Sequence, residues 1–106
     1  MYMYKFISIK KADDTKHKYQ VELMNEETKR KKTIKFGSAG MGDFIIFTKK
    51  DGKAEAEKHK ERYIDRHKKR EDWTKAGVAT SGFWAKHILW NKPTFEASLK
   101  DTLKIL

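Results

Sequence analysis

Apolar and polar residues alternate through the first third of the chain, with the two-residue period of a β-strand. The alternation runs through residues 2–7, 19–24 and 31–36. Asp13-Asp14-Thr15 and residues 25–28 supply turn chemistry between these stretches. We therefore expect three antiparallel strands joined as a meander. In the third strand, the even-numbered residues 32–36 should share one face and the odd-numbered residues 31–35 the other.

Glycines and an apolar cluster follow the predicted sheet. Gly37, Gly40 and Gly42 should end it, and the apolar run of residues 44–47 is too short to assign to a helix or a strand. We interpret that run as a buried connector. Asp51-Gly52 then predicts the cap of a helix over residues 53–69. Spacings of three and four predict that one face of this helix docks on the sheet; that face comprises Ala56, Lys60, Tyr63, Ile64 and His67.

The last third predicts two further helices. Residues 82–90 form an apolar stretch that Asn91-Lys92-Pro93 should stop. Thr94 should cap a final helix with an apolar stripe, made of Phe95, Leu99, Thr102 or Leu103, and Leu106. The predicted fold class is α+β, with an N-terminal three-stranded antiparallel sheet packed against two or three C-terminal helices in a single domain, residues 1–106. Tyr63, Ile64, Trp84 and Leu99 are predicted core residues.

Composition limits the class of protein. The chain has 106 residues, a size that suits one hydrophobic core. Aromatic residues make up 12%, more than disordered chains carry. The absence of cysteine excludes disulfides and thiolate metal sites, and it favours an intracellular or virion-interior setting. No apolar run approaches the roughly 20 residues that span a bilayer, and the N-terminus does not resemble a signal peptide.

Positive charge is concentrated in two segments of a chain whose net charge is +10. Residues 29–35 hold five basic residues and no acidic one, and residues 58–70 hold seven basic residues against two acidic ones. Neighbouring cations displace the counterions condensed on a polyanion, so these segments predict nucleic-acid binding. The predicted contact residues are Lys29, Arg30, Lys31, Lys32, Lys35, Lys58, Arg62, Arg66, Lys68, Lys69 and Arg70. We expect the two segments to form one continuous positive surface.

Lys58, Arg62, Arg66 and Arg70 recur every four residues, which predicts a basic stripe along the second segment. A charged stripe is often only a solvated helix face. Like charges at this spacing repel one another, however, and a bound anion would relieve the repulsion. Arginine suits phosphate through its forked donors, whereas lysine acts as a point charge.

Other candidate sites have simpler explanations. The glycine-rich turn of residues 36–43 lacks the Gly-Lys-Ser/Thr ending of a nucleotide-binding loop, so chain reversal accounts for it. His59 and His67 are two helical turns apart, too far for one metal ion. Glu61 and Asp65 are better explained as salt-bridge partners than as an acid/base pair. We expect no enzyme activity, no cofactor and no metal. The tryptophans are expected mainly in the core, with Trp73 the best candidate for an exposed one.

From about residue 34 onward, the chain resembles a family of small basic proteins of unknown function from nucleocytoplasmic large DNA viruses, marseillevirus-like and mimivirus-like. The stretches that carry the resemblance include residues 40–44, 62–69, 82–84 and, most distinctively, Leu89-Trp90-Asn91-Lys92-Pro93-Thr94. The resemblance implies a viral origin and a host nucleus, viral factory or virion interior as the location. It implies no activity and no catalytic residues.

These observations together predict a viral nucleic-acid-binding protein that contacts the phosphate backbone of duplex DNA with little sequence specificity. The alternative is a virion-architecture or host-protein interaction module that docks through exposed aromatic residues around Trp84 and Trp90. A small nuclease is a third possibility, against which the lack of a carboxylate or histidine cluster counts. DNA or RNA preference and oligomeric state stay open.

Overall fold

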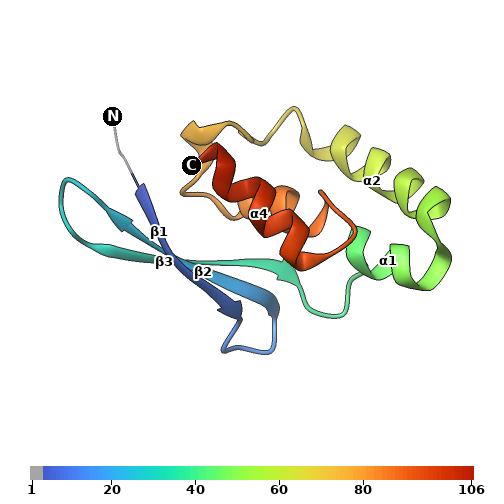
Figure 1. Ribbon diagram of the computed structural model, residues 1–106, viewed down its shortest axis with the longest axis horizontal. Helices are drawn as coiled ribbons and strands as arrows, with labels where there is room; N and C mark the ends of the chain where they lie inside the picture. The colour runs from blue at the N-terminus through green and yellow to red at the C-terminus, as the bar shows by residue number, and fades with distance from the viewer. Residues whose placement is uncertain (1–3) are drawn as a thin grey trace.

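The computed structural model describes residues 4–106 and contains an N-terminal sheet followed by helices (Figure 1). Strands β1 (Tyr4–Lys11), β2 (His17–Asn25) and β3 (Lys31–Ser38) are antiparallel, in the order β1-β2-β3. The predicted α+β class and the three-stranded meander are confirmed. The predicted start of the first strand at residues 2 and 3 lies outside the described residues.

One face of the sheet is apolar because the alternating residues of neighbouring strands pair in register. Val21 is opposite Ile34, and Tyr19 is opposite Phe36. Val21, Ile34 and Phe36 are buried, whereas the neighbouring Thr33 is exposed and Lys35 is half-buried. The predicted faces of the third strand are therefore confirmed at residues 33–36. Lys32 shares the face of Ile34 but is exposed, close to the hairpin tip that projects beyond the helices (Figure 1).

The apolar run after the sheet is a helix, so our interpretation of it as a connector is wrong. Asp43 is the N-cap of helix α1 (Phe44–Asp51), and its side chain accepts a hydrogen bond from the amide of Ile46 at 2.9 Å. Such an N-cap satisfies an amide that has no partner within the helix. Only Phe44 of this run is fully buried, and Ile46 is exposed.

Helix α2 (Lys53–His67) follows α1 directly. Gly52, at φ 87°, joins the two helices without a side-chain cap, and Asp51 is the last residue of α1. The expected capping by Asp51-Gly52 is thus limited to the glycine. The helix also ends at His67 rather than at residue 69. Arg70 therefore lies in the turn beyond the helix, and the helical part of the predicted stripe stops at Arg66.

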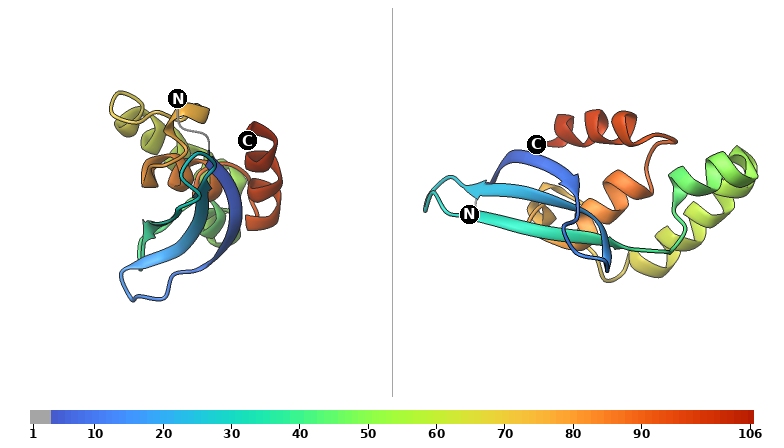
Figure 2. Two further views of the ribbon diagram at one scale, coloured as in Figure 1. Left: turned by 90° about the vertical axis from the view of Figure 1, so that its left-hand side faces the viewer. Right: turned by 90° about the horizontal axis from the view of Figure 1, so that it is seen from below.

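Helix α2 packs on α1 and lies beyond the end of the sheet, so the predicted docking on the sheet is wrong (Figures 1 and 2). Its apolar face nevertheless points inward as expected. Tyr63 stacks on Trp90 with ring centroids 4.6 Å apart. Lys60 donates a hydrogen bond from Nζ to the carbonyl of Asn91 at 2.9 Å and lies over the ring of Phe44.

The apolar face of the sheet is covered instead by the predicted helix near Trp84. A short 3-10 turn, η1 (Lys75–Gly77), precedes α3 (Ser81–Trp84), which continues into the wider π-helical segment η2 (Ala85–Leu89). Trp84 is fully buried, and its ring lies 6.1 Å from that of Phe6 and 6.4 Å from that of Phe36. Its indole nitrogen donates to the carbonyl of Val78 at 2.7 Å. This tryptophan occupies the place that we had predicted for the long helix.

Helix α4 (Phe95–Ile105) completes the packing. Thr94 caps it as predicted, accepting a hydrogen bond from the amide of Ala97 at 3.2 Å. Phe95 stacks on Tyr19, and Thr102 rather than Leu103 is the buried member of the stripe. The core prediction is confirmed for Tyr63 and Trp84, whereas Ile64 and Leu99 are half-buried at the edge of the core. Among residues 4–106, no helix is long and apolar enough to cross a membrane.

Candidate nucleic-acid interface

The starts of the two basic segments lie towards opposite ends of the molecule (Figure 1). The turn between β2 and β3, which carries Lys29 and Arg30, is at one end of the 44 Å long axis, and α2 is at the other (Figures 1 and 2). Lys29 adopts a positive φ of 61° in this tight turn. The expectation that the start of the third strand turns towards the long helix is therefore wrong. The length of the paired strands keeps the segments apart.

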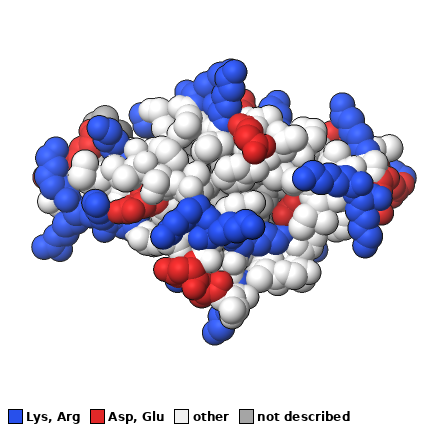
Figure 3. Space-filling model, turned by 60° about the horizontal axis from the view of Figure 1, so that its bottom comes forward, with Lys and Arg blue, Asp and Glu red and all other residues white. Residues whose placement is uncertain are grey.

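One face still presents basic side chains at both ends and across its middle (Figure 3). Carboxylates interrupt this surface, so it is a row of basic groups and not the continuous patch that we expected.

Several of the predicted contact lysines are already paired with carboxylates. Lys58 lies 3.3 Å from Glu55, and Lys68 lies 3.4 Å from Asp65, each one helical turn away. The contact between Lys68 and Asp65 agrees with the predicted role of Asp65 as a salt-bridge partner, whereas Glu61 makes no ion pair among residues 4–106. Lys31 lies 3.4 Å from Glu22 on the neighbouring strand. Exposed pairs of this kind are weak and exchange readily with other partners.

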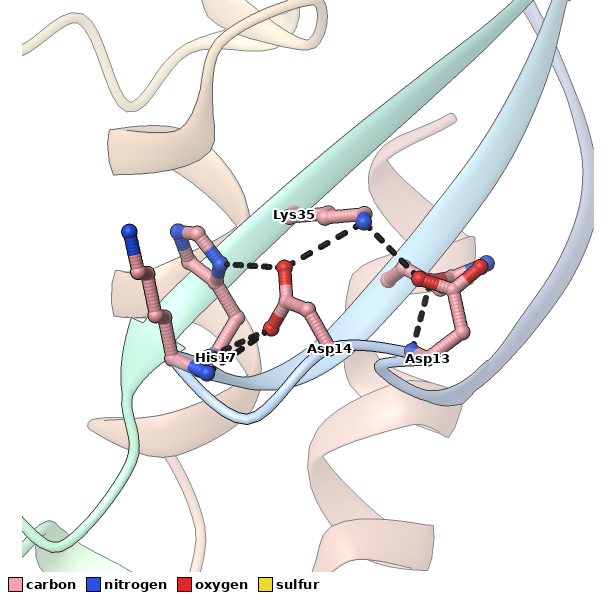
Figure 4. Close-up of polar contacts among 6 residues, drawn as sticks. Asp13, Asp14, His17 and Lys35 are labelled. Atoms are coloured by element: carbon pink, nitrogen blue, oxygen red, sulfur yellow. Dashed lines mark hydrogen bonds and ion pairs between the residues drawn. The ribbon is translucent and has the colours of Figure 1, made fainter.

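Lys35 belongs to a polar network at the turn between β1 and β2 (Figure 4). Its Nζ lies 2.8 Å from Asp13 and 3.2 Å from Asp14, and Asp14 also contacts Nδ1 of His17 at 3.0 Å. Hydrogen bonds from His17 and Lys35 hold the pKa of Asp14 well below its usual value, and the hydrogen bond to Asp13 raises the pKa of Lys35. Two carboxylates thus compete with any phosphate for this ammonium group.

The arginines have no such partners. The chain contains four of them, Arg30, Arg62, Arg66 and Arg70. All four are exposed, and among residues 4–106 none forms an ion pair or a side-chain hydrogen bond. Three of the four lie on α2 or in the turn after it. Lys29, Lys32 and Lys69 are likewise exposed and make no ion pair within the described part of the chain.

A cleft of about 520 Å³ lies between the sheet and α2. Its wall includes Lys35 from the first basic segment and Arg66 from the second, together with His17. The two segments therefore do approach each other at this point, through Lys35 and not through residues 29–32. Sequence reasoning missed the cleft because His17 lies on β2 whereas His59 and His67 lie on α2, and only the fold places them around one cleft.

Other candidate chemistry is sparse in the described residues. Among residues 4–106, no group of three histidine, aspartate or glutamate side chains is placed to hold a metal ion. The glycine-rich segment of residues 36–43 connects β3 to α1 and lines the cleft. Trp73 is half-buried, with Lys86 over its ring at 5.7 Å.

No protein-family model, curated protein or solved structure matches this chain. The resemblance to viral proteins therefore stays a prediction.

Proposed function

We propose that this protein binds nucleic acid through phosphate-backbone contacts, with duplex DNA as the preferred partner and little dependence on base sequence. The observation that carries the proposal is that the arginines of the second basic segment are exposed and have no carboxylate partner among the described residues. Arg62, Arg66 and Arg70 are exposed on α2 and the turn after it, and they lack carboxylate partners among the described residues, although Glu61, Asp65 and Glu71 are their neighbours in sequence.

Unpaired arginines are well suited to this partner. A guanidinium group presents forked donors that match two phosphate oxygens at once, and it is more weakly hydrated than an ammonium group. Each phosphate neutralised releases condensed counterions, which favours binding most at low salt. The lysine pairs at Lys58 and Lys68 are exposed and weak, so these side chains can also turn to phosphate.

The shape of the molecule is compatible with a duplex along its length. The long axis of 44 Å corresponds to about 13 base pairs at a rise of about 3.4 Å. A duplex lying along the face in Figure 3 would meet basic side chains at both ends. Contacts of this kind position a protein on a duplex without reading its bases, which supports the lack of sequence preference.

A charge-matched pair of variants tests the role of the arginines. Arg62→Gln/Arg66→Gln/Arg70→Gln removes three positive charges from α2 and its following turn. Lys92→Gln/Lys100→Gln/Lys104→Gln removes three exposed charges from α4 and the loop before it. In a gel-shift or anisotropy titration on duplex DNA, the arginine variant should lose most of the affinity for every sequence tried and about 2 to 3 units of the log–log salt slope.

The lysine variant should bind almost as the unchanged protein does. Equal losses in both variants would mean that net charge alone matters, and an unchanged arginine variant that is folded by circular dichroism would place the contact elsewhere.

The alternative of docking through exposed aromatics now lacks its two named residues, because Trp84 is fully buried and Trp90 is 9% exposed. A protein partner would have to use other surface groups. We propose further that the binding serves a viral genome in a viral factory, host nucleus or virion, which rests on the sequence resemblance alone.

A further inference from the structure

The cleft between the sheet and α2 has the size of a small-ligand site. Its volume of about 520 Å³ falls within the range of about 300 to 1,000 Å³ that is typical of pockets for organic ligands. It is bounded by the start of β2, the end of β3, one face of α2, and the α3 and η2 segments. An inorganic ion alone would leave most of this space unfilled.

One part of the wall favours an anion. Arg66 makes no ion pair among the described residues, and His59 and His67 project from the same helix into the same cleft. His17 faces them from β2, with Nδ1 held by Asp14 and with no hydrogen bond at Nε2 within residues 4–106. The cleft lysines are already neutralised, Lys18 by Asp43 and Lys35 by the two aspartates of the turn. Arg66 and the imidazoles are thus the groups left to bind a negative charge, and the carboxylate of Glu71, which makes no ion pair among residues 4–106, also lines the cleft.

Another part of the wall is aromatic. Phe47 and His59 stack in parallel, with ring centroids 3.8 Å apart and planes inclined by 9°. Tyr63 and Trp90 stack in the same manner at 4.6 Å and 8°. All four residues line the cleft, but Tyr63 and Trp90 are only 8% and 9% exposed, so the half-buried Phe47 and His59 provide the aromatic surface that a base can reach. Flat aromatic surfaces next to cationic groups are the combination by which proteins hold unpaired bases together with their phosphates.

We infer that this cleft binds one nucleoside phosphate, with the phosphate near Arg66 and the base against the aromatic wall. A free mononucleotide and an unpaired nucleotide at the end of a strand share this chemistry. The inference deepens the proposed function, since Arg66 also belongs to the duplex-binding surface, but it assigns a separate site that a blunt duplex does not fill.

Arg62 and Arg66 provide a matched pair for the test. Both are exposed arginines on α2, one helical turn apart, but only Arg66 lines the cleft. Binding of adenosine 5′-monophosphate can be followed by calorimetry or by the fluorescence of the tryptophans. Arg66→Gln should weaken this binding about tenfold, the effect of losing a charge-assisted hydrogen bond. Arg62→Gln should leave it within about twofold.

Further probes separate the sources of the ligand and the two proposals. Adenosine and inorganic phosphate, tested alone, should each bind far more weakly than the nucleotide. A hairpin duplex with a single-stranded overhang should depend on Arg66 more than on Arg62, whereas a blunt hairpin should lose affinity similarly with either variant.

The outcomes are distinct. If Arg66→Gln weakens binding more than Arg62→Gln only for the overhang duplex, the ligand is the end of a strand. If it does so only for adenosine 5′-monophosphate, the ligand is a free mononucleotide. If neither ligand shows this difference, or if inorganic phosphate binds as well as the nucleotide, the site is overturned. If the nucleotide site is overturned but the unchanged protein still binds the blunt duplex, the proposed function stands. If the unchanged protein binds the nucleotide through Arg66 but does not bind the blunt duplex, only the proposed function is overturned.

Discussion

The ion pair between Lys18 and Asp43 should be a main determinant of stability, because Asp43 is buried, Lys18 is largely shielded from solvent and the pair is tied to a helix start. The side chains are only 14% and 4% exposed, and Nζ lies 2.5 Å from Oδ2. The other carboxylate oxygen of Asp43 caps α1 at the amide of Ile46. Lys18 also donates to the carbonyl of Met41. One pair therefore fixes the start of β2, the glycine-rich turn and α1 relative to one another.

The expected magnitudes follow from these contacts. Asp43→Asn keeps a good capping side chain but leaves the largely shielded Lys18 ammonium group without a counter-charge, which costs at most about 3 to 5 kcal/mol. Asp43→Ala also removes the cap and should cost about 1 kcal/mol more. Since a domain of this size has about 5 to 15 kcal/mol in total, the alanine variant should lose a large part of its stability.

Urea denaturation followed by circular dichroism measures these losses. In a double-mutant cycle, Lys18→Met/Asp43→Asn should cost clearly less than the sum of the two single changes, because the double change leaves no unpaired charge. Lys31→Met, which breaks the exposed contact with Glu22, should hardly shift the denaturation midpoint. Additive single changes, or a loss below about 1 kcal/mol for Asp43→Asn, would refute the assignment of a stabilising buried pair.

Three further predictions concern the core, a glycine and a histidine. Ile88→Ala should cost about 2 to 5 kcal/mol because Ile88 is fully buried. Ile64→Ala should cost roughly half as much because Ile64 is half-buried. Equal losses for the two variants in urea denaturation would contradict the packing of α2. Gly77→Ala should destabilise by about 1 to 3 kcal/mol, because a Cβ there would meet the carbonyl oxygen of Asp72 at 1.9 Å; an unchanged melting temperature would contradict this close approach. Burial lowers the pKa of His87 below 6.5. Because the unfolded chain then takes up the proton first as the pH falls, stability should fall as the pH drops through about 6.5. His87→Gln should flatten this fall in a pH series of melting temperatures, and an equal slope in the variant would contradict the prediction.

Strand alternation identified the sheet well because each strand needed only a local signal. The same reasoning missed α1. Four apolar residues in a row do not discriminate between a helix and a strand, although Asp43, three residues before the capped amide of Ile46, was a readable N-cap signal.

Helical spacing identified the buried face of α2 but not what that face would touch. Tyr63 points inward as predicted, yet it meets Trp90 and not the sheet. Periodicity shows that a face is buried and carries no information about its partner. Trp84 competes for the apolar face of the sheet and covers it, which leaves α2 to pack beside the sheet.

The charge pattern located the candidate interface in the sequence but not in space. Strand length separates Lys29 from α2, and the turn of residues 12–16 brings Asp13 and Asp14 onto Lys35, more than 20 residues away along the chain. Non-local pairs of this kind follow from register, which composition does not reveal. The unpaired state of the arginines likewise depends on where the fold places the neighbouring carboxylates.

The salt dependence of duplex binding tests the central claim most directly. The affinity of the unchanged protein should be measured on two duplexes of about 13 base pairs with unrelated sequences, across a range of salt concentrations. A proposal based on phosphate contacts predicts a straight log–log plot with a steep negative slope, worth about 0.9 units for each phosphate neutralised, and the same line for both sequences. Binding that does not respond to salt, or no binding at the lowest salt concentration, would contradict it.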